Sequence, residues 1–78
     1  MSTELRTQIA ETLSLVLEQA VETDADFDFK TAGVDSVKML DIVMALEDTF
    51  DIRFSPQQMP KLSSLNATEE VVSQLVRK

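Results

Sequence analysis

The sequence predicts an all-α fold, an antiparallel four-helix bundle with three longer helices and one short third helix. Glycine occurs once and proline twice in 78 residues, so few positions interrupt a helix. Apolar residues recur at helical spacing in three long segments. The one segment that alternates like a strand has no second strand to pair with. The length allows a single domain, which we assign to residues 1–78.

The first helix is predicted over residues 3–20. Its apolar residues are spaced so that they share one face, and that face is expected to enter the core. The residues concerned are Leu5, Ile9, Leu13, Val16, Leu17 and Ala20.

Residues 21–35 form a long connection in which acidic and apolar side chains alternate from Asp24 to Phe29. Because no partner strand is available, we predict an extended loop whose Phe27 and Phe29 lie against the core. Loops of this length in small domains often carry function. A calcium loop from Asp24 to Asp35 is disfavoured, because Phe29 stands where such a loop requires glycine.

The second helix is predicted over residues 36–50, with Asp35 as its N-cap. An apolar stripe is expected to face the core and consists of Met39, Ile42, Val43, Leu46 and Phe50. A second stripe mixes apolar and acidic residues and faces elsewhere. It consists of Ser36, Val37, Leu40, Asp41, Met44, Glu47 and Asp48.

Two further helices complete the predicted bundle. Residues 55–58 have the pattern of a helix start, and Pro60 is expected to end that helix after one or two turns. The last helix is predicted to begin at a capping pattern in residues 66–69 and to continue to about residue 77. Its expected core residues are Val72, Leu75 and Val76.

The composition argues against catalysis by this chain. It contains no His, Cys, Trp or Tyr. Histidine and cysteine supply many of the acid–base and nucleophilic groups that work near neutral pH. A chain this short also has little room for an enclosed pocket. We therefore predict a protein that is not an enzyme and that binds no metal.

The charge indicates the kind of partner. Acidic residues outnumber basic ones by 14 to 7, for a net charge of -7. Such a surface repels nucleic acid and suits partner enzymes with basic docking patches. No apolar run is long enough to span a membrane, and the N-terminus lacks the features of a signal peptide. We expect a cytoplasmic monomer.

The segment from Gly33 to Val37 is the strongest candidate for chemistry. Glycine closes the loop, Asp35 caps the helix, and Ser36 takes the first helical position, where free backbone N–H groups favour a phosphate. The Asp35 carboxylate is also placed to hold a cation near such a phosphate. An Asp-Ser pair at a helix start is common capping chemistry, so these residues alone are a weak signal.

With its surroundings, this segment resembles the acyl carrier proteins and the related peptidyl and D-alanyl carriers. The family's Asp-Ser-Leu motif stands here as Asp35-Ser36-Val37. The stretch from Ile42 to Ile52 is similar to the second helix of bacterial carriers and its exit. The resemblance covers nearly the whole chain. It implies a 4'-phosphopantetheine arm on Ser36, whose thiol carries acyl groups as thioesters.

The resemblance also implies partners and a pathway class. A separate phosphopantetheinyl transferase would move the arm from coenzyme A onto Ser36, since the chain has no histidine to activate that hydroxyl. Acyl-loading and acyl-processing enzymes would follow, in fatty-acid-like, polyketide-like or other specialised lipid synthesis. Two alternatives stay open: an aminoacyl carrier of the D-alanyl or peptidyl kind, and an unmodified acidic helical adaptor.

Some residues depart from the family pattern. Val37 and Ala32 each replace a leucine, and Lys38 stands where fatty-acid carriers have an acidic or small polar residue. Residues 29–31 replace an acidic approach to the glycine. These changes leave the attachment motif intact and favour a dedicated pathway over the housekeeping one.

Two surfaces follow from these patterns. The mixed stripe beside Ser36 is predicted to dock partner enzymes through Val37, Asp41, Met44, Glu47 and Asp48. An apolar acyl chain is expected to enter between the second helix and the short third helix, because a short helix with a proline has few contacts to lose on opening. The expected lining is Leu46, Phe50, Phe54, Met59 and Leu62.

Overall fold

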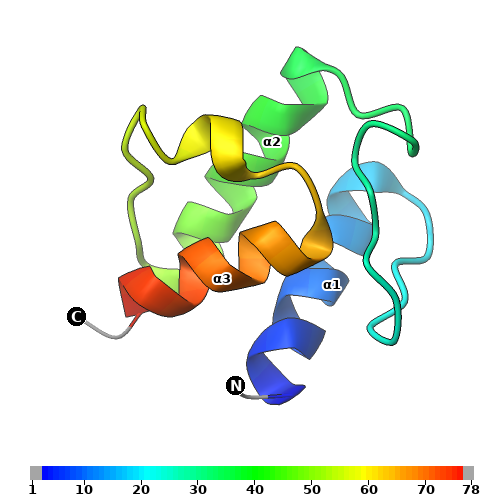
Figure 1. Cartoon of the computed structure of the whole chain (residues 1–78), viewed down its shortest axis with the longest axis horizontal. Helices are drawn as coiled ribbons and strands as arrows, with labels where there is room; N and C mark the ends of the chain where they lie inside the picture. The colour runs from blue at the N-terminus through cyan, green and yellow to red at the C-terminus, as the bar shows by residue number, and fades with distance from the viewer. Residues whose placement is uncertain (1–2, 77–78) are drawn as a thin grey trace.

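The computed structural model describes residues 3–76 and confirms the all-α fold (Figure 1). It contains three α-helices, α1 (Thr3–Leu17), α2 (Ser36–Phe50) and α3 (Leu65–Val76), and a short 3-10 helix, η1 (Met59–Lys61). Helix α1 contacts both α2 and α3. The predicted short third helix is a single 3-10 turn of three residues, η1.

Helix α1 ends earlier than predicted. Its last residue is Leu17, and Glu18 has a left-handed backbone with φ of 55°. The chain then folds back, so that the N–H of Val21 donates to Ser14 Oγ at 3.2 Å. Val21 packs against the core, whereas Ala20 is exposed, contrary to the prediction. The rest of the predicted face is correct, with Ile9 and Leu13 fully buried and Leu5, Val16 and Leu17 partly buried.

The loop after α1 lies against the core as predicted. Phe29 is buried, Phe27 is partly buried, and their rings meet edge to face with centroids 6.0 Å apart. The backbone N–H of Phe29 donates to the carbonyl of Ser63 at 3.1 Å, and the N–H of Leu65 donates to the carbonyl of Phe27 at 2.9 Å. These bonds join the loop to the segment that leads into α3.

Two acidic residues of this loop accept hydrogen bonds from other parts of the chain. Asp28 accepts from the N–H of Lys30 at 3.1 Å and from the hydroxyl of Thr31 at 2.9 Å. Asp26 accepts from the N–H of Asn66, in the first turn of α3, at 2.9 Å. Within residues 3–76, no three possible metal ligands group together. Asp26 and Asp28 thus accept hydrogen bonds, whereas Phe27 and Phe29 between and after them pack against the core.

Arg6 joins three parts of the fold. Its Nη1 donates to Glu69 Oε1 on α3 at 2.7 Å. Its Nε and Nη2 donate to the carbonyls of Thr23 at 2.6 Å and Ala25 at 2.9 Å. Glu69 is only 5% exposed, so the charge of this carboxylate is balanced inside the fold by Arg6.

Helix α2 has the predicted bounds, residues 36–50. Its core face is also as predicted: Ile42, Val43 and Leu46 are buried, and Met39 and Phe50 are partly buried against them. The helix ends at Asp51, whose backbone is left-handed with φ of 54°. In Figure 1, α2 runs in the direction opposite to α1. The side of α2 that faces away from the core is exposed to solvent.

The prediction that Pro60 ends the short third helix is wrong. Pro60 lies inside η1, directly after its first residue. The N–H groups of the first helical residues have no partner within the helix, so proline costs no helical hydrogen bond there. The capping pattern upstream does form, since Gln58 Oε1 accepts from the N–H of Ser55 at 2.8 Å. That pattern closes a turn before η1 instead of starting an α-helix.

Helix α3 also begins at a different cap from the one predicted. Ser64 is the cap, with its Oγ accepting from the N–H of Ala67 at 3.2 Å, so the helix starts at Leu65 and not at Asn66. Val72 is fully buried and Leu75 partly buried as predicted, but Val76 is 41% exposed. The predicted end near residue 77 lies outside the described residues.

Candidate functional site

Ser36 occupies the first position of α2 and is exposed. The residue before it, Asp35, is extended, with φ of -96° and ψ of -176°, and its Oδ1 accepts from the N–H of Lys38 at 2.9 Å. The Asp35 carbonyl accepts the helical bond from Met39 at 2.9 Å. Asp35 is therefore the N-cap that the sequence predicts. It holds the Ser36 hydroxyl at the positive end of a helix dipole, where an attached phosphate is stabilised.

A tight turn carries the chain into this site. Gly33 has φ of 83°, a left-handed conformation that a side chain would strain. Its N–H donates to the carbonyl of Lys30 at 3.1 Å, and Val34 donates back to the carbonyl of Phe29 at 3.0 Å. Because Phe29 is anchored in the core, this turn fixes where α2 begins.

A hollow of about 370 Å³ opens beside Ser36. Its walls come from two parts of the chain that are distant in sequence: residues 28–39 around the start of α2, and Leu62 and Ser63 after η1. The lining residues are Asp28, Phe29, Lys30, Val34, Asp35, Ser36, Met39, Leu62 and Ser63. Apolar side chains from both parts line the hollow, and Ser36 borders it.

The predicted docking stripe lies on the open side of α2. Val37 and Met44 are 67% and 65% exposed, and Asp41 and Asp48 are exposed beside them. Glu47 differs, because it is only partly exposed and its Oε2 accepts from the backbone N–H of Phe54 at 2.9 Å. That carboxylate stabilises the chain after α2.

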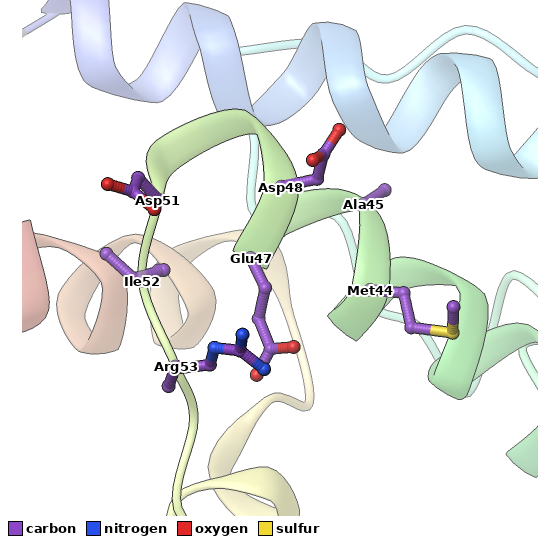
Figure 2. Close-up of a pocket in the computed structure, with 7 residues that line it drawn as sticks. All are labelled: Met44, Ala45, Glu47, Asp48, Asp51, Ile52 and Arg53. Atoms are coloured by element: carbon purple, nitrogen blue, oxygen red, sulfur yellow. The ribbon is translucent and has the colours of Figure 1, made fainter.

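A second hollow of about 560 Å³ lies at the far end of the stripe (Figure 2). It is lined by Met44, Ala45, Glu47, Asp48, Asp51, Ile52 and Arg53. Figure 2 shows Glu47 projecting from α2 and Arg53 from the segment that follows the helix. Helical spacing does not place Asp51, Ile52 and Arg53 in this surface, because they lie beyond the end of α2.

Lys38, a departure from the family pattern, has a structural role. Its Nζ donates to the carbonyl of Val16 at 3.3 Å, in the last turn of α1. A cation at the carbonyl end of a helix is favoured by the helix dipole. The side chain is partly buried in this contact.

The residues predicted to line an acyl chamber lie in the core. Leu46, Phe54 and Leu62 are buried, and Phe50 and Met59 pack against them. Of the five, Leu62 borders one of the two hollows in this surface, the one beside Ser36. An acyl chamber in the core stays a prediction.

We predict that Asp35→Ala lowers the free energy of unfolding by about 1 kcal/mol, the usual loss for an N-cap. Asp35→Asn keeps a side-chain oxygen for the N–H of Lys38 and is the matched control, expected to lose only a few tenths. Urea unfolding followed by circular dichroism measures both. Equal losses in the two variants would assign the stabilisation to the charge of Asp35 and not to its capping bond.

Comparisons with known sequences agree with the geometry of this site. Residues 3–72 match the family described as "Phosphopantetheine attachment site". The chain is 34% identical over 65 residues to "Acyl carrier protein SF2, chloroplastic" of Brassica campestris and to "Acyl carrier protein, chloroplastic" of Brassica napus. Each alignment covers 83% of this chain and 47% of the relative, so the chain spans about half the length of these relatives.

Solved structures with the same fold include two that cover 99% of this chain. One is titled "The ishigamide ketosynthase/chain length factor", with a TM-score of 0.80, 25% identity and 100% of that chain covered. The other is the acyl carrier protein of Thermotoga maritima, with a TM-score of 0.78, 23% identity and 96% of that chain covered. The second likeness concerns the fold alone.

Proposed function

This chain belongs to the phosphopantetheine-attachment family of acyl-carrier-like proteins, and from that premise we propose that it carries acyl groups as thioesters on an arm attached to Ser36. The family carries a covalent 4'-phosphopantetheine. The observation that carries the proposal is Ser36 itself, an exposed hydroxyl at the first position of a capped helix, beside an apolar-walled hollow.

The attachment is a phosphoryl-group transfer. The Ser36 oxygen attacks the phosphorus that bears the pantetheine in coenzyme A, a phosphodiester forms, and adenosine 3',5'-bisphosphate leaves. The proton of the hydroxyl passes to a base of the transferase, because this chain contains no histidine. Once attached, the arm supplies the thiol for thioester formation, which a chain without cysteine cannot supply. The chain itself presents and shields the arm and performs no catalysis.

We assign the cargo to acyl chains of fatty-acid-like, polyketide-like or other specialised lipid synthesis. The names of matched proteins support this: the Brassica relatives are acyl carrier proteins, and the ishigamide structure is named for a ketosynthase. The apolar walls of the hollow beside Ser36 also suit an alkyl chain better than a charged amino acid. An aminoacyl carrier is the second candidate, and an unmodified adaptor is the third.

Intact mass after incubation with coenzyme A and a phosphopantetheinyl transferase tests the proposal. We expect a mass increase of one phosphopantetheine, and an unchanged mass would leave only the adaptor. Incubating the holo protein with acyl-loading and aminoacyl-loading enzymes then separates the two carriers. Loading by an aminoacyl enzyme alone would overturn the acyl assignment.

We further propose that partner enzymes dock on the stripe formed by Val37, Asp41, Met44, Glu47 and Asp48. Exposed apolar side chains alternate with carboxylates there, and Ser36 begins the same helix. A surface of this kind is complementary to a basic patch with an apolar centre. Asp51, Ile52 and Arg53 extend the surface beyond the helix.

Reversing Asp41 and Asp48 to Lys is expected to slow arm attachment about tenfold at low salt, because rim charges act mainly on the association rate. Glu47 is left unchanged because its carboxylate holds the N–H of Phe54. The matched control reverses Glu11 and Glu22, which are exposed acids outside the stripe, and so changes the net charge equally. Equal slowing in both pairs would show that net charge, not this stripe, governs the encounter.

We also propose a cytoplasmic monomer. Within residues 3–76, no helix has the length and apolar character needed to cross a membrane. The Brassica relatives, by contrast, are described as chloroplastic.

A further inference from the structure

One buried hydroxyl in the core has no partner. Thr68 is 0% exposed, and its Oγ1 makes no hydrogen bond with any residue that the structure describes. Other buried hydroxyls are satisfied: Thr12 donates to the carbonyl of Gln8 at 2.9 Å, and Ser73 donates to the carbonyl of Glu70 at 2.8 Å. Since a buried polar group without a partner destabilises a fold, Thr68 is an exception that calls for a reason.

Thr68 lies on the core face of α3. It follows Leu65 by three residues and precedes Val72 by four, and both of these neighbours are fully buried. Leu65 and Leu62 belong to one hydrophobic cluster, and Leu62 borders the hollow beside Ser36. The buried cluster that includes Leu62, Leu65 and Val72 therefore extends from the wall of the hollow to the part of α3 that carries Thr68.

We infer that Thr68 is a specificity-determining residue that favours acyl chains bearing an oxygen along the chain, of the keto or hydroxyl class. This inference rests on the proposed function. When an acyl chain attached through the arm at Ser36 enters the core, some contacts between apolar side chains are lost. The methylenes of the acyl chain make new apolar contacts in their place. A saturated chain leaves Thr68 Oγ1 unpaired, whereas a chain oxygen at the right depth accepts its hydrogen bond.

The preferred cargo is therefore the product of a condensation step before full reduction. Condensation of two acyl units leaves a keto oxygen on the chain, and complete reduction removes it. A carrier that shields oxygenated chains suits a sequence of reactions in which those oxygens are kept. The fully saturated chain is the poorer occupant of this core.

Thermal unfolding of four loaded forms tests the inference. The holo protein is prepared with amide-linked, hydrolysis-stable arms bearing octanoyl, 3-oxo-octanoyl, 5-oxo-octanoyl or 7-oxo-octanoyl chains. We expect at least one oxo form to melt about 4–8 °C above the octanoyl form, the shift of one net hydrogen bond in a domain of this size. The position of the best oxo group reports the depth of Thr68.

Variants of Thr68 identify the hydroxyl as the cause. Thr68→Val removes the hydroxyl at nearly constant shape, and we expect it to abolish the preference for the oxo chain without lowering the melting temperature of the unloaded holo form. Thr68→Ser keeps the hydroxyl and should keep the preference. Thr12→Val is the matched control, because it removes a buried hydroxyl that already has a partner, and the preference should survive it.

The outcomes separate this inference from the function beneath it. If mass spectrometry shows no arm on the native chain, the proposed function falls and the inference falls with it. If the octanoyl arm raises the melting temperature and no oxo form exceeds it, the carrier function stands and the role of Thr68 is overturned. The same holds if Thr68→Val keeps the preference, or if no loaded form melts above the unloaded one.

Discussion

Ser36→Ala is expected to abolish arm attachment completely while leaving the helical circular dichroism unchanged. The hydroxyl of Ser36 is the only atom at the start of α2 that is both nucleophilic and exposed in the attachment motif. Alanine is a good helix former, and the cap is provided by Asp35, so α2 keeps its start. The variant therefore separates attachment from folding.

Intact mass after exhaustive treatment with coenzyme A and transferase measures the effect. Ser63→Ala is the matched control, because Ser63 is exposed and lines the same hollow. We expect Ser63→Ala to be modified fully. Attachment that persists in Ser36→Ala would refute the assignment, and peptide mapping would locate the serine or threonine responsible.

Arg6→Met is expected to lower the free energy of unfolding by about 3–5 kcal/mol, the usual loss when one partner of a buried ion pair is removed. The side chains of Arg6 and Glu69 are only 18% and 7% exposed. Methionine leaves the carboxylate of Glu69 buried without its cation. It also frees the carbonyls of Thr23 and Ala25, which anchor the loop before α2. Since small domains are stable by about 5–15 kcal/mol, this loss takes a large share of the total.

Urea unfolding of a set of variants tests this account. Combining Arg6→Met with Glu69→Leu removes the unpaired charge and should recover part of the lost stability. The two loop carbonyls stay without their donor, so recovery should be incomplete. Arg53→Met is the control for loss of an exposed arginine and should change stability by less than about 1 kcal/mol. A loss of similar size in Arg6→Met would mean that the pair behaves like a surface ion pair.

The sequence correctly predicts the bounds of a helix when the residues that start and end it are its own neighbours in the chain. Helix α2 begins where predicted because Asp35 caps it from the adjacent position, and it ends where predicted at Asp51, whose backbone is left-handed. The start of α3 could not be predicted in this way. Ser64 and Asn66 are both good caps, and the choice between them depends on Asp26, which satisfies the N–H of Asn66 from 40 residues away.

The same distinction applies to the site. The place of Ser36 at a helix start follows from five consecutive residues, so the sequence predicts it. The hollow beside Ser36 cannot be predicted from a local pattern. Its walls combine residues 28–39 with residues 62–63, which only the folded chain brings together. Glu47 shows a similar limit: helical spacing places it on the docking stripe, while its bond to Phe54 depends on the path of the chain after α2.

The contact between Arg6 and Glu69 also determines how this domain can be moved into other proteins. The two residues are 63 positions apart, and the guanidinium of Arg6 donates both to carbonyls of the loop before α2 and to Glu69 on α3. A transplanted segment that begins after Arg6 has a buried carboxylate with no counter-charge. A segment that stops before Glu69 leaves the guanidinium of Arg6 without its carboxylate. The folded setting of the predicted attachment motif therefore depends on residues near both ends of the described chain. A fusion design that needs a working carrier has to transfer both halves of this ion pair together with everything between them.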